Sequence, residues 1–355
     1  MAVSLPHAGA HVPLAVETRG RVVESVHYGA VAVVDRQGNI VYRAGDPDLL
    51  TFTRSALKPL QALPFVIAGG LDRFGFSGPQ TALLCASHSG EPRHVAAVAD
   101  MLAKSGSSAD ELQCGTHAPG FYEARGEIPP PPPYSPLAHN CSGKHAGMLA
   151  YCVLCGAPKA TYLALDHPLQ IAIRRAVAEF TQVPEAELVA AVDGCSAPNY
   201  AVPLSALARA YARLATADRD TAYGDAPRRL ADAMKAHPEM VSGARRSDLA
   251  LMQAGRGDWI TKIGAEGVQA IGVRSHGLGI AIKVADGQKR GLYPAIVAVL
   301  DALGLLDAEG REALAALGRR TVRNYCGLVT GEVESTVVLD KPAHPSPTSE
   351  SAFSA

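Results

Sequence analysis

Hydrophobic and polar residues alternate in two parts of the chain, one near each end. Residues 22–45, VVESVHYGAVAVVDRQGNIVYRAG, alternate around RQGN, which predicts a β-hairpin. Residues 257–287 place Val and Ile at alternating positions among glycines, which predicts an antiparallel hairpin or meander. The two patterns together predict one antiparallel sheet built from both ends of the chain.

Between these parts, apolar residues recur every three to four positions, which is typical of helices that pack one face against a core. Helices are predicted directly after Ser55 and over residues 92–106, 167–182 and 203–216, and another over 292–304. Residues 127–136, EIPPPPPYSP, form a loop in this prediction because proline fixes φ and lacks an amide proton.

These elements predict an α/β (α+β) sandwich that forms a single unit over residues 1–340. A mostly helical block, about residues 141–240, is inserted between the sheet segments. This reading is favoured over a duplicated two-domain architecture. Residues 341–355, KPAHPSPTSESAFSA, are polar and proline-rich and are predicted to be a disordered tail.

Composition narrows the class of protein. Hydrophobic residues make up 48% of the 355 residues and charged residues 19%, and the net charge is −1, so neither disorder nor a nucleic-acid partner is expected. No apolar run reaches the roughly 20 residues that span a bilayer, and residues 1–20 lack a secretory pattern. Seven cysteines, an odd number, fit reduced thiols better than a disulfide framework. We therefore expect a cytoplasmic enzyme without a membrane partner.

Ser55 and Lys58 are three positions apart in TFTRSALKPLQALP, residues 51–64. One interpretation is structural: Thr53 or Ser55 caps the helix, and Lys58 lies on its solvent face. The other is catalytic, since residues three apart share a helix face and a lysine can take the proton of a serine. A lysine acts as a base only where burial or neighbouring cations favour its neutral form, so further cations are needed.

Three more segments offer polar groups in glycine-rich turns. Lys144 in HNCSGKHAG and Lys262 in WITKIGAEG are flanked by glycine, where backbone approaches a ligand closely, although each could be a surface lysine. CASHSGE places Ser87 and His88 at what is predicted to be a strand-to-helix turn, either facing a pocket or, with Ser89, capping the helix.

Cysteines follow a similar pattern. Cys141 and Cys195 each lie in a tight glycine turn, close in sequence to Lys144 and Asp193, and two thiolates with a nitrogen or oxygen donor suit zinc. Neither turn has C-x-x-C spacing, so a zinc site and a thiol-based module both stay open. The C-x-x-C pair in AYCVLCGA, Cys152 and Cys155, is assigned to core packing.

Taken together, these segments resemble the rhizobial-type asparaginase II family, the class 3 L-asparaginases. The resemblance runs in one order through almost the whole chain: ESVHYGAVAVVD, TRSALKPLQALP, CASHSGE, HNCSGKHAGML, DHPLQ, VDGCSAPNYAVPL, HPEMVSG and TKIGAEGVQAIG. It implies the fold of serine β-lactamases, penicillin-binding proteins and one class of glutaminases. It also implies homodimers and hydrolysis of L-asparagine to L-aspartate and ammonia.

The resemblance also implies roles for individual residues. Ser55 would be the nucleophile and Lys58 its base, while Ser87 would be a second catalytic serine coupled to Lys262. Zn²⁺ would be held in a supporting role by Cys141, Lys144 and Cys195. The residues expected to line the substrate site are Arg54, His88, Asp193, Gly264 and Glu266.

Three rival functions stay open on the sequence alone. A penicillin-recognising hydrolase is disfavoured because Ile-Gly follows Lys262 where K-T-G is expected, and Ser142-Gly143-Lys144 stands where S-D-N is expected. A glutaminase-like hydrolase would differ by one methylene of substrate, which changes discrimination by only about 1–3 kcal/mol. A zinc- or thiol-based binding module is the rival outside enzymes.

Overall fold

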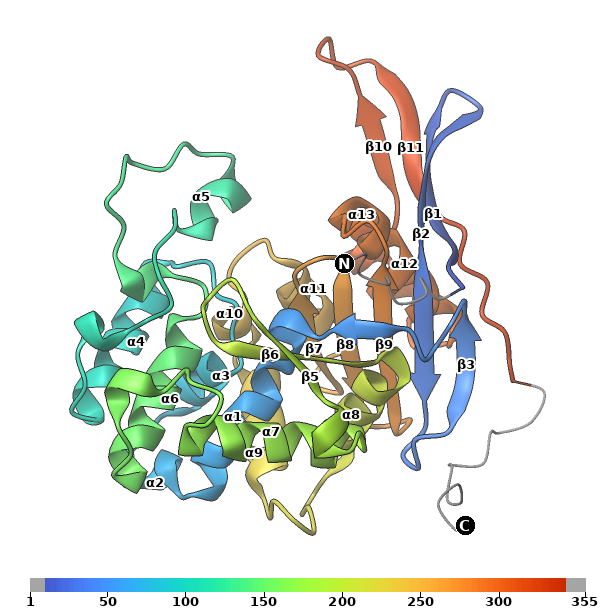
Figure 1. Ribbon diagram of the computed structural model, residues 1–355. Helices are drawn as coiled ribbons and strands as arrows, with labels where there is room; N and C mark the ends of the chain where they lie inside the picture. The colour runs from blue at the N-terminus through green and yellow to red at the C-terminus, as the bar shows by residue number, and fades with distance from the viewer. Residues whose placement is uncertain (1–9, 343–355) are drawn as a thin grey trace, which may run out of the picture.

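A computed structural model describes residues 10–342 of the chain. An eight-stranded antiparallel sheet runs in the order β10-β11-β1-β2-β9-β8-β7, with β3 paired to β2 (Figure 1). Its strands are β1 (Val12–Arg19), β2 (Val22–Val34), β3 (Ile40–Ala44), β7 (Trp259–Gly264), β8 (Val268–Val273), β9 (Leu278–Val284), β10 (Arg320–Arg323) and β11 (Val329–Ser335). Strands from both ends of the chain thus meet in one sheet, as predicted.

The two faces of the central strands carry side chains of different size. On β2, Ala30, Ala32 and Val34 belong to one buried cluster, and Val31 and Val33 belong to another on the opposite face. Successive residues of a strand point to opposite faces, so this alternation gives the sheet a small-residue face and a branched face. A helix can pack closely against the small-residue face.

Helix α8 (Leu204–Thr216) occupies that face. A Cβ atom at Gly279 would lie 1.8 Å from the carbonyl oxygen of Ala208, and one at Gly272 would lie 2.4 Å from that of Tyr211. Both positions therefore require glycine because the helix backbone lies directly on the strands. The glycines that weaken the strand pattern in the sequence are the contact points of this layer.

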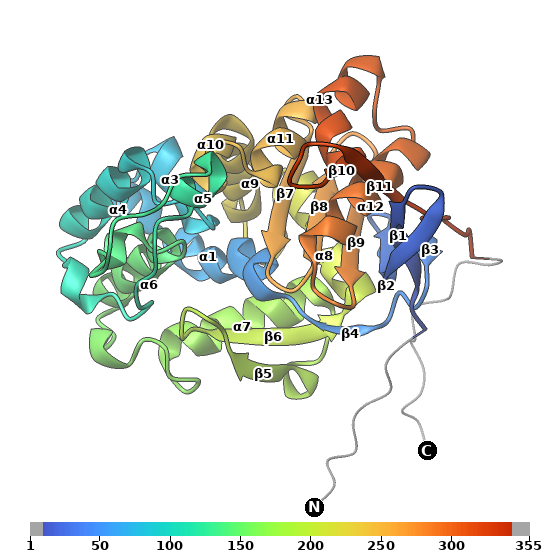
Figure 2. The same cartoon turned by 90° about the horizontal axis from the view of Figure 1, so that it is seen from above.

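The opposite face is covered by C-terminal helices, namely α11 (Ser247–Ala254), α12 (Lys289–Ala302) and α13 (Ala308–Gly318). The second half of the molecule is helical and lies beside α8 (Figure 2). Its helices are η1 (Arg54–Leu57), α1 (Lys58–Ile67), α2 (Gly70–Phe74), α3 (Gly78–Leu84), α4 (Pro92–Lys104), η2 (Ala109–Glu111), α5 (Gly120–Arg125), η3 (Pro136–Ala138), α6 (Ser142–Cys155), η4 (Lys159–Thr161), α7 (Pro168–Thr181), η5 (Glu185–Glu187), α9 (Ala226–Ala236) and α10 (Pro238–Val241).

A smaller sheet links the two halves. Strands β4 (Leu50–Phe52), β6 (Pro198–Pro203) and β5 (Val189–Val192) pair in the order β4-β6-β5. The register places Phe52 opposite Ala201, so the chain entering η1 is held beside the segment that follows Cys195. This pairing brings two sequence-distant motifs together.

The α/β architecture with an antiparallel sheet from both chain ends is confirmed, as are the 22–45 hairpin and the 257–287 meander. The predicted loop over residues 127–136 is confirmed except for Pro136, which begins η3. Two details were wrong. Residues 78–84 form helix α3, not a strand before Ser87, and Cys155 is exposed, although Cys152 is buried as predicted. The block predicted as mostly helical also contains the short strands β5 and β6.

The predicted tail lies almost wholly at residues 343–355, outside the described residues. Among residues 10–342, no helix combines the length and apolar character that crossing a bilayer requires.

Candidate active site

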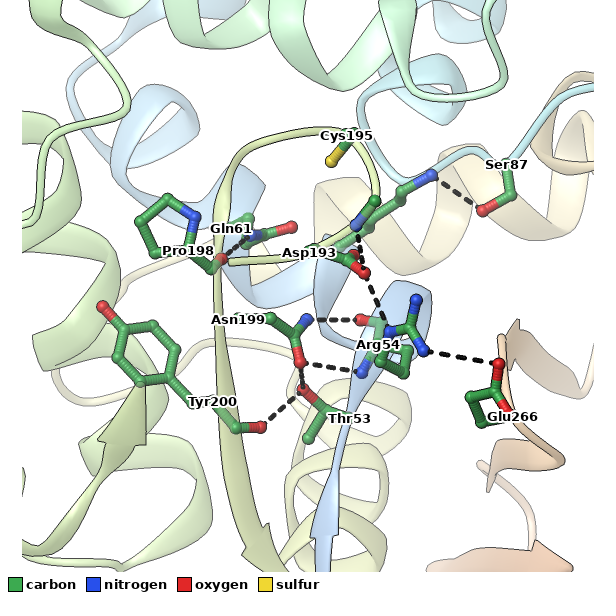
Figure 3. Close-up of polar contacts among 12 residues, drawn as sticks. Thr53, Arg54, Gln61, Ser87, Asp193, Cys195, Pro198, Asn199, Tyr200 and Glu266 are labelled. Carbon is green, nitrogen blue, oxygen red and sulfur yellow. Dashed lines mark hydrogen bonds and ion pairs between the residues drawn. The ribbon is translucent and has the colours of Figure 1, made fainter. Parts of the chain in front are cut away.

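The turn that carries Ser55 is fixed by Asn199 from β6. The side-chain oxygen of Asn199 accepts the Arg54 N–H at 3.0 Å, and its amide nitrogen donates to the Arg54 carbonyl at 2.9 Å (Figure 3). The hydroxyl of Thr53 donates to the Tyr200 carbonyl at 3.0 Å and makes no helix cap, contrary to one interpretation of the sequence. Asn199 gives no signal of this role in the sequence because the contact is purely tertiary.

Arg54 and Glu266 both adopt left-handed backbone conformations, with φ of 48° and 58°. Non-glycine residues rarely adopt this region, and such strain tends to concentrate at functional sites. The Arg54 guanidinium donates to Asp193 at 2.8 Å and lies 3.9 Å from the Glu266 carboxylate (Figure 3). Three of the predicted substrate-site residues therefore meet beside Ser55.

Asp193 is charged in this arrangement. Burial alone would raise its pKa, but hydrogen bonds from Arg54 and the Gly194 N–H, together with the charges of Lys144 and Arg54, hold the pKa of Asp193 below its ordinary value. The site thus presents a carboxylate and a guanidinium side by side, next to a half-buried serine.

Lys58 is buried, with 1% of its surface exposed, so the solvent-face interpretation is wrong. Its Nζ donates to the Ala86 carbonyl at 2.5 Å and to the Ser87 hydroxyl at 2.7 Å. Within residues 10–342, no hydrogen bond joins Lys58 to Ser55. The structure pairs this lysine with the second predicted serine, 29 positions away.

The turn at Ser87 is held rigidly. The Ser87 N–H donates to the Val241 carbonyl, and the His88 N–H donates to the Asn140 carbonyl. His88 uses both ring nitrogens: Nδ1 accepts the Gly90 N–H at 3.1 Å, so Nε2 is the donor to the Ser142 hydroxyl at 2.9 Å. Burial lowers the pKa of His88 well below its ordinary value, which keeps the ring neutral. This geometry fits a role in positioning Ser87.

Lys262 lies on β7 and is completely buried, so it is not a surface lysine. Its Nζ donates to the Ile263 carbonyl at 2.8 Å and forms an ion pair with Asp248 at 3.4 Å. Asp248 is equally buried and also accepts bonds from Thr261, the Ile263 N–H and Gln269. No hydrogen bond links Lys262 to Ser87 among the described residues, and Asp248, which the sequence did not single out, is its partner.

Burial lowers the pKa of Lys262 to about 8, since the charges of Lys58 and Arg246 add to the effect and Asp248 offsets only part of it. The folded state thus releases this proton more readily than the unfolded chain, where lysine titrates near its ordinary value of about 10.4. Between about pH 8 and 10.4 the unfolded state binds more protons, so stability rises with pH.

We therefore expect the free energy of unfolding to gain roughly 3 kcal/mol from this group across that window. Chemical denaturation of the wild type and of Lys262→Met at several pH values measures the gain as a difference in slope. The slope should be smaller in the variant by the contribution of Lys262, while Lys283, whose pKa burial also lowers, still contributes in both proteins; equal slopes would contradict the assignment.

A second cluster joins Cys141, Lys144 and Cys195, all of which are buried. Lys144 Nζ donates to Cys195 Sγ at 3.0 Å. A hydrogen bond from Cys195 and the charges of Lys58 and Lys144 hold the pKa of Cys141 well below its ordinary value, despite burial. Burial opposes the charge of Lys144, but both cysteines raise its pKa above the ordinary value. The predicted zinc ligands are thus brought together.

His145 adjoins this cluster. Burial lowers its pKa to about 4, so the ring is neutral, and Nδ1 lies 2.6 Å from the Tyr162 hydroxyl. Nε2 is buried without a hydrogen-bond partner among the described residues. Among the described residues, no group of three or more His, Cys, Asp or Glu side chains is arranged to hold a metal ion, so a zinc site here would need the Lys144 amine as a ligand.

Gly264, at the end of β7, lies against the serine turn. A Cβ atom there would stand 2.9 Å from the Thr53 carbonyl oxygen and 3.2 Å from the Cβ of Arg54. Only glycine allows β7, an edge strand of the large sheet, to approach η1 this closely. The approach places the strand that carries Lys262 beside the residues around Ser55.

A family model described as L-asparaginase II matches residues 15–335. The chain belongs to this family. The resemblance seen in the sequence is thereby confirmed, and the L-asparaginase II family places the chain among asparaginase-type amidohydrolases, hydrolases that act on amides. No curated protein matches the chain.

Solved structures give distant similarities. The structure described as "Mglu in its native form" is 16% identical, with a TM-score of 0.35, and the match covers 79% of this chain and 66% of that one. The structure described as a "putative beta-lactamase from Bacteroides dorei" is 13% identical, with a TM-score of 0.40, over 77% of this chain and 93% of that one.

Proposed function

We propose that this member of the L-asparaginase II family hydrolyses the side-chain amide of L-asparagine, giving L-aspartate and ammonia through a serine acyl-enzyme. The observation that carries the proposal is the pairing of Arg54 with Asp193 at 2.8 Å beside Ser55. A free amino acid carries a carboxylate and an ammonium group on one carbon. A guanidinium next to a carboxylate complements both charges.

In this proposal Arg54 binds the α-carboxylate of asparagine and Asp193 binds its α-ammonium group. Glu266, whose side chain is 69% exposed and lies 3.9 Å from Arg54, borders the entrance. Anchoring both α-groups directs the side-chain amide toward the Ser55 hydroxyl, which is half-buried and so more accessible than Ser87 at 4% exposure. Accessibility favours Ser55 as the residue that is acylated.

The chemistry then follows from the buried lysines. Lys58 Nζ takes the proton of Ser55 as the serine oxygen bonds to the amide carbon. The carbon–nitrogen bond breaks, and the proton passes from Lys58 through the Ser87 hydroxyl, 2.7 Å away, to the leaving nitrogen, which departs as ammonia. Water hydrolyses the β-aspartyl ester by the reverse use of the same groups.

Backbone amides supply the oxyanion site. Ser55 lies in the first turn of η1, where backbone N–H groups have no acceptor within the helix. A second N–H comes from β7 near Gly264, whose close approach to η1 depends on the absence of a side chain. Two fixed donors of this kind stabilise the negative charge that develops on the amide oxygen.

Zn²⁺ is part of the proposal in a supporting role. Cys141, Cys195 and Lys144 would hold it, since two thiolates and an amine are within the range of donors that zinc accepts. When bound, the ion would supply local positive charge and order the turns that carry its ligands. Lys144 would have to lose its proton on binding, so zinc affinity should increase with pH.

Removing one thiol tests the metal site. Cys195→Ser should bind zinc at least about tenfold more weakly, because a hydroxyl is a poor substitute for a thiolate ligand. Cys155→Ser, an exposed cysteine outside the cluster, is the matched control and should retain about one zinc ion per chain. Metal content after chelation and dialysis against zinc measures both; equal zinc in the two variants would remove this cluster as the site.

Ammonia release from L-asparagine, L-glutamine and a chromogenic β-lactam separates the candidate substrates. The proposal requires ammonia from asparagine at a higher kcat/KM than from glutamine and no β-lactam turnover. A glutamine preference would favour the glutaminase-like alternative, and inertness toward all three would favour a zinc- or thiol-based module. A homodimer in the cytoplasm is expected on the family resemblance and the reduced cysteines.

A further inference from the structure

A basic hollow lies between α5 and the N-terminal ends of α11 and α12. Its volume is about 330 Å³, which suits a small metabolite. Five cationic side chains line it: Arg245, Arg246, Lys289, Arg290 and Arg320. The one acidic lining residue is Glu123. None of the proposed catalytic or zinc-binding residues lines this hollow.

Acidic side chains of the protein neutralise little of the positive charge in this hollow. Arg290 is paired with Glu17 at 2.5 Å, but in the part of the chain from residue 10 to 342 no ion pair involves Arg245, Arg246, Lys289 or Arg320. Arg246 is also half-buried, so water screens its charge less than at an exposed position. Like charges gathered in a hollow repel one another unless an anion offsets them.

A second arginine-rich hollow shows the contrast. It is lined by Arg36, Arg209, Arg213 and Arg219, but also by Glu179 and Asp220. Arg213 bonds to Asp220 at 2.7 Å and to Glu179 at 3.1 Å, so that hollow neutralises much of its own charge. In the hollow beside α5, only Arg290 has such a pair among the described residues, so most of the positive charge stays available to a ligand.

The walls also offer directional contacts. A Cβ atom at Gly120 would lie 3.4 Å from Nη1 of Arg246, so the absence of a side chain there leaves the guanidinium clear on that side. Tyr293 and Ser247 add hydroxyl groups to the lining. Guanidinium groups bind carboxylate and phosphate oxygens through paired hydrogen bonds, and hydroxyls can add further donors.

We propose that this hollow is a binding site for a small, multiply charged anion, a di- or tricarboxylate or a phosphate ester, separate from the asparagine site. The site is connected to the catalytic groups by the chain itself, because Ser247 in its wall directly precedes Asp248, the partner of Lys262. An occupant would therefore contact the segment that positions Lys262.

Isothermal titration calorimetry of the full chain tests the site, with pyrophosphate and citrate as separate probes for the phosphate and carboxylate classes. Saturable binding of at least one probe is expected, weakened at least about tenfold in Arg246→Gln and in Arg320→Gln. Arg320 is exposed, so its variant keeps the test valid if Arg246→Gln folds poorly. Arg21→Gln, an exposed arginine outside the hollow, should bind like the wild type.

If only one of the two probes saturates the site, the ligand belongs to the class of that probe, phosphate or carboxylate. The proposal is overturned if neither probe saturates, if both hollow variants bind like the wild type, or if Arg21→Gln loses as much affinity as they do. The readout does not depend on amidohydrolase activity, so it stands apart from the fate of the proposed reaction.

Discussion

Ser55→Ala is expected to lower kcat for ammonia release from L-asparagine by at least about 1,000-fold, because the variant has no oxygen with which to form the acyl-enzyme. Ser55 is half-buried and its side chain makes no hydrogen bond among the described residues, so the fold should be unaffected. Steady-state kinetics with a coupled ammonia assay measures the loss, and thermal unfolding verifies the fold.

Ser87→Ala is the informative comparison. Ser87 is proposed to carry a proton, and positioned proton transfer is typically worth about 100- to 10,000-fold, so a residual rate above that of Ser55→Ala is expected. Ser205→Ala, in the first turn of α8, should behave like the wild type because the Ser205 hydroxyl bonds to Asp48 and to none of the proposed catalytic residues. Near wild-type activity of Ser55→Ala would show that the nucleophile is assigned to the wrong residue.

Substitution of Lys58 should lower kcat as much as substitution of Ser55. Methionine at position 58 keeps the apolar stem in the buried position but removes the amine that bonds to Ser87, so kcat should fall at least about 1,000-fold. Lys58→Arg should fail as well, since a guanidinium keeps its proton and cannot act as a base. These two variants separate the need for a positive charge from the need for a removable proton.

The same kinetic assay and a thermal scan decide the outcome for Lys58. Lys104→Met, at a partly exposed helix position, is the matched control and should retain activity. Substantial activity in Lys58→Arg would contradict the role of Lys58 as a base and leave it with an electrostatic role only.

The parts of the structure that periodicity defines could be predicted from the sequence. Alternation specified the 22–45 hairpin and the 257–287 meander, and three-to-four spacing specified α4, α7, α8 and α12. The sequence predicts a strand where helix α3 forms because TALLCA is a short run in which Thr81 is the one polar residue. Burial on all sides removes the periodicity that would distinguish the two.

The residues of the candidate site could be identified from the sequence, but not their partners. Lys58 meets Ser87 and Lys262 meets Asp248 only after β7, α11 and the helical half assemble, so spacing along the chain holds no signal for either contact. Asp248 lies in RRSDLA, a polar stretch that is typical of a solvent-exposed helix N-terminus. The role of Asp248 can be recognised only in the structure, where its carboxylate pairs with the Lys262 amine.

The measurement that tests the central proposal most directly is the site of acylation. The enzyme is mixed with L-asparagine, quenched in acid within the first turnovers and mapped by peptide mass spectrometry. The proposal predicts a β-aspartyl ester on the peptide that carries Ser55 and none on the peptide that carries Ser87. An ester on Ser87 would contradict the proposal.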